Sequence, residues 1–501
     1  MPDIQLAALA PIGFAGFGAI VVLMGEVLLS RRQRFLGRPV SDAWIGSVLA
    51  FVSVFFLVLS AVASMQAYSL GYALVFNPDN PMIRIDRFAS FGITLVALAS
   101  ALSCLLSVAY LATLRINHGE YYALLLLATS GMMLLIASTD LITVFLGFEL
   151  MSIPLYALAG FDRSRVRSNE SALKYFLVGA FASAILLYGM ALLYGATGHT
   201  DFNGLRAALD FGSPLALAGL ALVLVGFAFK VAAVPFHQWA PDVYEGAPTS
   251  VTAYMSVTVK VAAFAALLRL LGSAVGPAPE NLSGVLWGLA AATLLLGNLM
   301  AVVQQNVKRL LAYSSIAHAG YVLMGLVSGT EGGQAAVLFY LLAYVFMNLG
   351  AFAVIVALAR DGQDFDRISD FAGLSRTRPG LAGLMTLFML SLAGIPPTAG
   401  FFAKFYIFSA AVDAGYLWLT VIAVLTTVVS VYYYLRLPVA MYMQEPSDEV
   451  PRAETSTGET LVLAVCAAGV VFFGIFPSHA PGMLSGIRAL DWARESVAFL
   501  F

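Results

Sequence analysis

The chain has 501 residues, of which 60% are hydrophobic and 11% are charged, and its mean hydropathy is +0.89. Soluble domains are typically about 45 to 50% apolar and about 25% charged, so this composition excludes an ordinary soluble protein and predicts a polytopic membrane protein. The formal net charge of −2 argues against nucleic acid as a partner. Cys104 and Cys466 stand alone in apolar runs, which indicates neither a disulfide framework nor a metal or iron–sulfur site.

Apolar runs of membrane-spanning length follow one another along the chain and predict an all-α fold with about fourteen transmembrane helices. Because this number is even, both termini are expected on the same side of the membrane. Sixteen Lys and Arg fall in the loops of one side and five in those of the other, which places both termini outside by the positive-inside rule. The runs lie at 6–29, 42–65, 88–114, 119–138, 140–161, 171–196, 214–237, 249–272, 283–303, 309–328, 334–359, 381–410, 415–441 and 458–477.

Proline interrupts two of these runs. In the seventh run Lys230 precedes Pro235 by five residues, and in the twelfth Lys404 follows Pro397 by seven. Proline breaks a helix, and broken helices at membrane depth are tolerated where they line a hydrated cavity. The reversed order of lysine and proline favours an inverted repeat of two five-helix units, runs four to eight and nine to thirteen. The predicted parts are a three-helix segment (1–118), the first repeat (119–272), the second repeat (283–441) and a C-terminal loop, helix and tail (442–501).

The two basic residue types are distributed differently. Four of the five lysines lie inside predicted spans, whereas Arg269 is the only one of the twenty-one arginines that does. A buried lysine, unlike an arginine, can lose its proton, so the spans carry cations that can titrate. Lys308 is counted with the basic residues of an inside loop. Arg269 lies near a helix end, where its side chain can snorkel to the membrane surface.

Titratable groups recur near the middle of the spans. Glu149, in the fifth run, should be protonated or paired with a lysine of another helix, because an isolated carboxylate there is costly. His318 can pass a proton from one ring nitrogen to the other. We define the titratable row as Glu149, Lys230, Lys260, His318 and Lys404. Since no substrate-sized polar cluster accompanies it, the row indicates transport of a proton or a small cation.

Two further residues are secondary candidates for a proton path. Lys174 lies near the inner end of the sixth run, and His237 would share a helix face with Lys230 if the seventh helix were continuous. Structural roles remain open as alternatives: an ion pair for Glu149, snorkelling for Lys174 and hydrogen-bonded packing for His318.

Three segments resemble a known family. They are FKVAAVPFHQWAPDVYEGAPT from Phe229, KRLLAYSSIAHAGY from Lys308 and GIPPTAGFFAKF from Gly394. They resemble the antiporter-like membrane subunits of respiratory complex I, the proton-pumping NADH:quinone oxidoreductase, and of multisubunit sodium/proton antiporters. The resemblance covers nearly the whole chain. Within complex I it favours the subunit with a lysine, rather than a glutamate, at the position of Lys404.

The resemblance implies residue roles. It puts the fifth-helix glutamate of the family on Glu149, the lysine of the first broken helix on Lys230, the eighth-helix lysine on Lys260 and the lysine of the second broken helix on Lys404. Lys174 and His318 match positions along the same hydrophilic axis. The family also has two inverted five-helix repeats, which agrees with the pattern of prolines.

The resemblance implies cofactors and partners as well. NADH, FMN, iron–sulfur clusters and quinone would lie in partner subunits, with no cofactor and no metal in this chain. Gly13, Gly16 and Gly18 lie in a transmembrane run with no preceding strand, so they are not a dinucleotide fingerprint. Expected partners are other membrane subunits of complex I, including a neighbouring antiporter-like subunit, and the lipid of a bacterial inner membrane. A sodium/proton antiporter subunit is the alternative, and a non-transporting scaffold would leave the four lysines unexplained.

Overall fold

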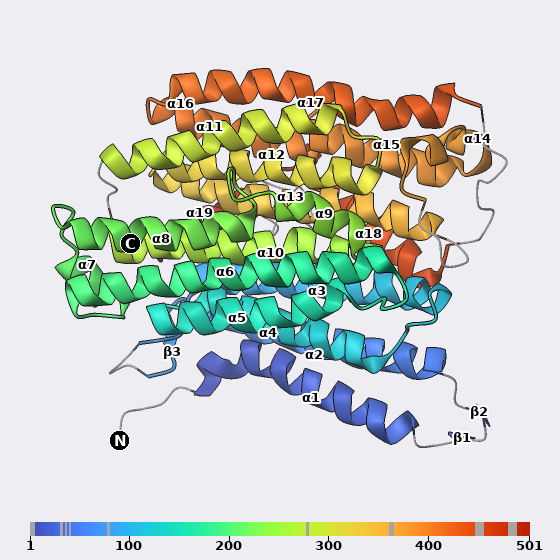
Figure 1. The fold of residues 1–501 in the computed structure, drawn as a ribbon, viewed down its shortest axis with the longest axis horizontal. Coiled ribbons are helices and arrows are strands. Elements are labelled where there is room, and N and C mark those ends of the chain that lie inside the picture. The colour runs from blue at the N-terminus through green and yellow to red at the C-terminus, as the bar shows by residue number, and fades with distance from the viewer. Residues whose placement is uncertain are drawn as a thin grey trace.

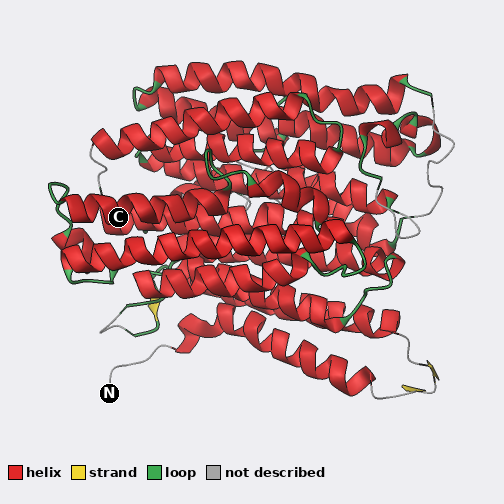
Figure 2. Cartoon of the chain, in the orientation of Figure 1, coloured by secondary structure: helices red, strands yellow, loops and turns green. Residues whose placement is uncertain are grey.

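The structure is a computed structural model, and it describes residues 6–30, 34–35, 38–39, 42–77, 81–276, 280–359, 365–445, 455–478 and 488–500. Nearly all of these residues are helical, and the long helices lie side by side as one bundle (Figures 1 and 2). Thirteen helices within the described residues are long and apolar enough to cross a membrane. The chain is therefore a multi-pass membrane protein of the all-α class, as the composition predicts.

The N-terminal part and the first predicted repeat contain ten α-helices within the described ranges. The N-terminal part consists of η1 (Leu6–Leu9), α1 (Ala10–Ser30), β1 (Arg34–Phe35), β2 (Arg38–Pro39), α2 (Asp42–Leu70), β3 (Leu74–Val75), β4 (Arg84–Ile85) and α3 (Arg87–Thr113). The strands form two antiparallel pairs, β1 with β2 and β3 with β4. The first repeat consists of α4 (Gly119–Ala137), α5 (Leu141–Ala159), α6 (Val166–Thr197), α7 (Phe202–Ala208), α8 (Pro214–Val231), α9 (Trp239–Gly246), α10 (Thr249–Arg269) and the π-helical turn η2 (Leu270–Val275).

The second predicted repeat and the C-terminal part are also helical. Their elements are α11 (Glu280–Val302), α12 (Val307–Val327), α13 (Glu331–Leu358), η3 (Ile368–Phe371), α14 (Leu374–Thr377), α15 (Pro379–Ala393), α16 (Ala399–Asp413), α17 (Leu417–Met443), α18 (Thr457–Ile475) and α19 (Ala489–Val497). The long helices alternate in direction, so α1 and α18 run in opposite senses across the bundle (Figure 1). Which end of the bundle faces the inside of the cell stays a prediction.

Both proline-interrupted runs are broken, as predicted. The seventh run divides into α8 and α9, and the twelfth into α15 and α16. Helix α8 ends at Val231, where Ala232 turns into the left-handed region with φ +58°. Helix α15 ends before Gly394, whose φ of +85° a glycine adopts without strain. Each break exposes the last carbonyl oxygens of a helix inside the protein, where they need donors.

Glycine brings the first two helices of each predicted repeat into backbone contact. A methyl group on Gly131 of α4 would lie 2.3 Å from the Met151 backbone nitrogen of α5, and one on Gly147 2.7 Å from that of Leu135. Helices α11 and α12 meet in the same way through two glycines, Gly297 and Gly320. Small residues permit such close approach in membrane proteins. The two helix pairs thus share a close backbone contact, and the inverted repeat itself stays a prediction.

A third glycine contact joins the halves of the second broken helix. A methyl group on Gly400 would lie 1.8 Å from the Ser391 carbonyl oxygen, so Gly400→Ala should force α15 and α16 apart. We expect this variant to lose at least the roughly 1 to 3 kcal/mol typical of overpacking. The midpoint of thermal unfolding of the purified protein in detergent would show the loss. Gly383→Ala in α15 is the matched control, because its methyl group would meet nothing within 4 Å. Equal midpoints would contradict the expectation.

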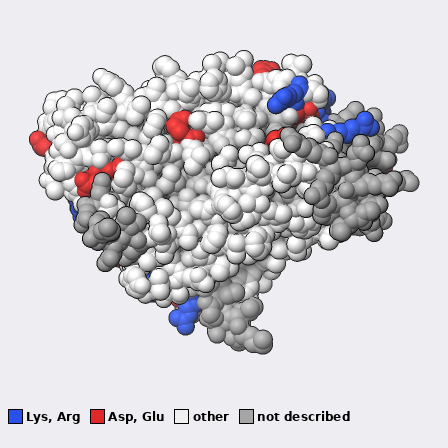
Figure 3. All heavy atoms as spheres, turned by 90° about the horizontal axis from the view of Figure 1, so that it is seen from below, with Lys and Arg blue, Asp and Glu red and all other residues white. Residues whose placement is uncertain are grey.

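The outside of the bundle is apolar and the inside is partly polar. Large apolar side chains such as Phe181 (71% exposed), Leu425 (62%) and Trp418 (75%) face outward. Figure 3 shows that charged side chains are few over the face that it presents. By contrast α10 is buried along its whole length and α12 along nearly all of it. These two central helices carry Lys260 and His318.

Candidate functional site

Lys230 is buried at the end of α8, with 1% of its surface exposed. Its Nζ donates hydrogen bonds to Ser152 Oγ of α5 at 2.7 Å and to the Tyr175 hydroxyl of α6 at 3.4 Å. It also lies 4.9 Å from the centre of the Phe148 ring and 5.9 Å from that of Tyr156. A cation is favoured at a helix C-terminus and over aromatic faces. The hydroxyl groups, the aromatic rings and the helix end therefore stabilise the Lys230 ammonium without a direct contact to a carboxylate.

The predicted ion pair between Glu149 and Lys230 is absent from the described structure. Glu149 Oε1 is buried without a hydrogen-bond partner, and the Lys230 ammonium binds Ser152, one turn further along α5, and Tyr175. Glu149 is partly buried and shares a helix face with three exposed residues, Ile142, Leu146 and Ile153. The prediction of a direct pair was therefore wrong for this structure, because hydroxyl groups of Ser152 and Tyr175 take the hydrogen bonds of the ammonium. A protonated Glu149, the other expectation, stays a prediction.

Lys260 of α10 connects two other helices. Its Nζ donates to the Val231 carbonyl oxygen, the last residue of α8, at 3.0 Å, and to the Ser315 carbonyl oxygen of α12 at 2.8 Å. Only 4% of Lys260 is exposed. The lysine thus satisfies a carbonyl that the break in the seventh helix leaves open.

His318 has a hydroxyl group on each ring nitrogen. Nδ1 lies 2.5 Å from the Tyr340 hydroxyl of α13, and Nε2 lies 3.0 Å from the Tyr434 hydroxyl of α17. Tyr434 is also hydrogen-bonded to Ser314. A tyrosine hydroxyl can donate or accept, so the ring can exchange a proton with either partner.

Lys404 of α16 resembles Lys260 in its surroundings. Its Nζ donates to the carbonyl oxygens of Leu392 at 3.1 Å and Ala393 at 2.9 Å, which end α15. The Tyr321 ring lies 4.9 Å from the ammonium and 6.0 Å from the His318 ring. This aromatic side chain fills the space between the last two members of the titratable row.

Hydroxyl groups lie in the space between Lys260 and His318. The Tyr344 hydroxyl donates to Ser315 Oγ at 2.9 Å, and its ring lies 5.1 Å from the His318 ring. The Tyr244 hydroxyl is 3.5 Å from the same serine oxygen. The structure therefore brings Lys230, Lys260, His318 and Lys404 into one buried row across the bundle.

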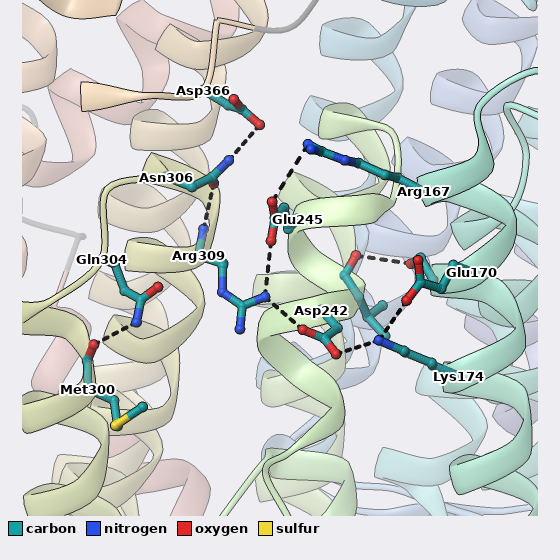
Figure 4. Close-up of polar contacts among 12 residues, drawn as sticks. Arg167, Glu170, Lys174, Asp242, Glu245, Met300, Gln304, Asn306, Arg309 and Asp366 are labelled. Atoms are coloured by element: carbon teal, nitrogen blue, oxygen red, sulfur yellow. Dashed lines mark hydrogen bonds and ion pairs between the residues drawn. The ribbon is translucent and has the colours of Figure 1, made fainter. Parts of the chain in front are cut away.

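The secondary candidates lie apart from this row. The Lys174 side chain is 44% exposed and forms ion pairs with Glu170 at 2.8 Å and Asp242 at 2.7 Å. Figure 4 shows it in a cluster of charged residues between α6, α9 and α12. His237 lies in the break between α8 and α9, and its buried Nδ1 has no hydrogen-bond partner. A role of either residue in proton transfer stays a prediction.

Arg269 does not reach toward the membrane surface, contrary to the expectation from the sequence. Its side chain is 1% exposed and forms two hydrogen bonds with Asp86, at 2.7 and 3.0 Å. Asp86, 183 residues earlier, also accepts from the Ala89 backbone nitrogen at the start of α3. The expectation was wrong because a buried carboxylate, distant in sequence, meets the end of α10 and replaces water as the partner.

The chain is similar to known membrane proteins over most of its length. Residues 138–430, more than half of the chain, match the family model described as NADH:quinone oxidoreductase/Mrp antiporter, TM. The NADH-quinone oxidoreductase subunit N of Trichlorobacter lovleyi is 48% identical over 86% of this chain and 88% of the relative. That of Myxococcus xanthus is 42% identical over 97% of this chain and 98% of the relative.

The chain belongs to this family.

Two solved structures show how far the likeness to the NADH:quinone oxidoreductase/Mrp antiporter family extends. A chain of respiratory complex I from Thermus thermophilus is 34% identical, with a TM-score of 0.78 over 93% of this chain and 97% of that one. A chain of the Mrp complex from Dietzia is 24% identical, with a TM-score of 0.81 over 98% and 97%. The second likeness concerns the fold alone.

Apart from Tyr321, which lies within one turn of His318 in the sequence, sequence reasoning missed the tyrosines of this family member. Six buried tyrosines contact the titratable row: Tyr156, Tyr175, Tyr321, Tyr340, Tyr344 and Tyr434. A tyrosine in an apolar run predicts packing as readily as function. The spacing of Tyr340 and Tyr344, one turn apart on α13, was the available signal, because it places two hydroxyl groups on one helix face.

Among the described residues, one group of side chains could hold a metal ion. Glu26, His118 and Glu120 offer ligand atoms within 4.8 Å of one another. They lie near the end of α1 and the start of α4, and Glu26 Oε2 already accepts a hydrogen bond from the Gly119 backbone nitrogen at 3.0 Å. Cys104 and Cys466 are separate buried thiols.

Proposed function

We propose that this chain is the proton-translocating subunit N of a membrane-bound NADH:quinone oxidoreductase. Its work would be to move protons across the membrane, driven by redox chemistry in partner subunits. The observation that carries the proposal is the buried row of Lys230, Lys260, His318 and Lys404. Each member can release a proton, whereas the buried arginine Arg269 lies outside the row in an ion pair.

The groups along the row differ in what they can do. Backbone carbonyl oxygens hold Lys260 and Lys404 in place, but a carbonyl accepts a hydrogen bond and passes on no proton. Hydroxyl and imidazole groups both donate and accept. The stretch from Ser314 through Tyr434 and His318 to Tyr340 is therefore where side chains can carry a proton, and water would complete the remaining steps.

Glu149 would couple the row to a neighbour. At about 6 Å and an effective dielectric constant near 20, a charge pair is worth roughly 2.8 kcal/mol. Moving a proton against 100 mV requires about 2.3 kcal/mol. Bringing the carboxylate toward Lys230 and withdrawing it would therefore change the cost of proton release by an amount of the right size.

The partly buried position of Glu149, beside exposed apolar side chains of α5, supports a partner subunit on this face. A carboxyl group among exposed apolar side chains of α5 is costly in lipid, and a second antiporter-like membrane subunit would cover it. NADH, FMN, iron–sulfur clusters and quinone would belong to other partner subunits. The basic loops would face the inside of a bacterial inner membrane and both termini the periplasm.

Purification of the tagged chain in mild detergent tests this assignment directly. NADH:quinone reductase activity that travels with the tag in a large assembly would support it. A purified assembly with its peripheral subunits present but without that activity would contradict it. The shared fold of the Mrp complex then favours the alternative, a sodium/proton antiporter subunit, for which sodium-dependent transport without NADH is the measurement.

Lys404→Arg separates charge from titration in the row. Arginine keeps a cation at the end of α15 but does not release its proton. We expect the assembled complex to oxidise NADH and to translocate fewer protons per NADH, measured in reconstituted vesicles. A proton yield equal to that of the wild type would mean that only the charge of Lys404 matters.

A further inference from the structure

Lys308 is a buried cation that the proton path described above does not use. The sequence places it in a loop, but Asn306 accepts a hydrogen bond from the Arg309 backbone nitrogen at 3.0 Å and so starts α12 ahead of it. Only 1% of Lys308 is exposed, and its Nζ donates to the Ala247 carbonyl oxygen at 2.8 Å. Ala247 directly follows α9, so this lysine lies at the end of the second half of the broken helix.

A polar cleft lies directly beside Lys308. It encloses about 240 Å³ and is lined by three basic and three acidic side chains, Arg167, Lys174, Arg309, Glu170, Asp242 and Glu245. Arg309 bridges Asp242 at 2.7 Å and Glu245 at 3.0 Å (Figure 4). Several of these side chains are well exposed, Arg167 by 72% and Glu170 by 57%. A charged and open cleft of this size holds water.

Residues that line the cleft lie next to Lys308 in α12 and next to its hydrogen-bond acceptor, Ala247. Gly246 lines the cleft and precedes Ala247, whose carbonyl oxygen accepts from Lys308. Arg309 lines it and follows Lys308 in α12. The buried ammonium therefore lies behind the wall of a water-accessible space at the end of the bundle that carries the basic loops.

Helix α12 leads from Lys308 to the titratable row. Ser315 lies seven residues further and His318 ten, which puts all three on one helix face. Ser315 accepts from Lys260 through its carbonyl oxygen and contacts Tyr244 of α9 through its hydroxyl group. Seven residues of helix span about 10.5 Å, a distance that a chain of two or three water molecules would bridge. A route from the cleft to the middle of the row would therefore run between α9 and α12, which carry Tyr244 and Ser315.

We propose that Lys308 is a further proton-carrying residue of this subunit, delivering protons from the cleft to the Ser315–Lys260 part of the row. An N–H bond of Lys308 breaks as its proton passes to the inner water chain. A proton from cleft water restores that bond, and the delivered proton forms an N–H bond at the neutral Lys260 amine. The inference rests on the proposed function, because it requires that the row carries protons.

A fixed structural role is the competing explanation. A cation at the end of α9 stabilises the helix dipole and satisfies the Ala247 carbonyl oxygen without releasing a proton. Lys308→Arg keeps the charge for that role and does not titrate, whereas Lys308→His is smaller and keeps a transferable proton. The two variants therefore respond in opposite directions under the two explanations.

The experiment compares Lys308→Arg and Lys308→His in the assembled complex, reconstituted in vesicles, with protons translocated per NADH as the readout. We expect Lys308→Arg to lose this subunit's share of the proton yield at normal assembly, and Lys308→His to recover part of it. Arg163→Ala, which removes an exposed cation that does not line the cleft, is the matched control and should keep the yield. A full yield in Lys308→Arg, or a higher yield in Arg than in His, would overturn the inference.

Lys230→Ala in the same assay distinguishes a failure of the inference about Lys308 from a failure of the proposed function. If Lys230→Ala lowers the yield and Lys308→Arg does not, the inference about Lys308 is wrong and the proposed function stands. If Lys230→Ala also leaves the yield unchanged, the proposed function fails, and the inference that rests on it fails too.

Discussion

Replacing Lys230 with alanine is expected to remove most of the proton translocation by this subunit, while the complex still assembles and oxidises NADH. Lys230 is the first lysine of the row, and its Nζ binds Ser152 one turn from Glu149. Without the ammonium, the electrostatic influence of Glu149 has no proton to act on. The neighbouring hydroxyl groups of Ser152 and Tyr175 do not replace it, because neither carries a releasable positive charge at neutral pH.

The measurement is the number of protons translocated per NADH in vesicles that hold the reconstituted complex. Lys230→Met is a second variant, since methionine fills much of the same volume and limits collapse around the aromatic rings. Arg163→Ala, at an exposed position between α5 and α6, removes a cation outside the row and should leave the yield unchanged. Wild-type yield in both Lys230 variants would rule out a proton relay through this residue.

Arg269→Ala should cause the largest loss of stability. Removing one partner of a buried ion pair typically costs about 3 to 5 kcal/mol, and here the buried Asp86 would keep only the part-exposed Arg84 as a charged partner. Asp86 is fully buried and joins the start of α3 to the end of α10. We therefore expect little assembled complex, and a lower midpoint of thermal unfolding for what does assemble.

Two further variants give this prediction its controls. Arg84 also contacts Asp86, at 3.2 Å, but its side chain is 40% exposed. Arg84→Ala should cost at most about 1 kcal/mol, as for other solvent-exposed ion pairs. The double variant Arg269→Met with Asp86→Leu removes both charges and should recover much of the lost stability. Equal midpoints for Arg269→Ala and Arg84→Ala would contradict the expected importance of burial.

The spans and the breaks could be predicted because they depend on local sequence. A run of apolar residues has to be helical in a membrane, and Pro235 and Pro397 limit where the helices continue. The buried row could be predicted in part for a similar reason. A lysine inside an apolar run needs a polar environment wherever the run packs, so Lys230, Lys260 and Lys404 indicate one.

What could not be predicted depends on residues far apart in the sequence. Arg269 was expected at the membrane surface because its partner, Asp86, belongs to a different part of the chain. Lys308 was assigned to a loop because its depth depends on how α12 packs against α9. Whether Glu149 meets Lys230 directly depends on how α5 packs against α8. Helical periodicity puts residues on a common face, but the helices that cover this face are determined by tertiary contacts.

The glycine contacts between α4 and α5 and between α11 and α12 limit how this subunit can respond to a partner. Backbones that touch at Gly131 and Gly297 cannot slide past one another without opening gaps along the whole contact. We therefore expect these helix pairs to act as rigid frames, and information to cross the subunit as a change of electric field. Such a field weakens with distance according to Coulomb's law. The distance between successive charges then limits how far one subunit can influence the next. A helix that moved as a lever would not have this limit.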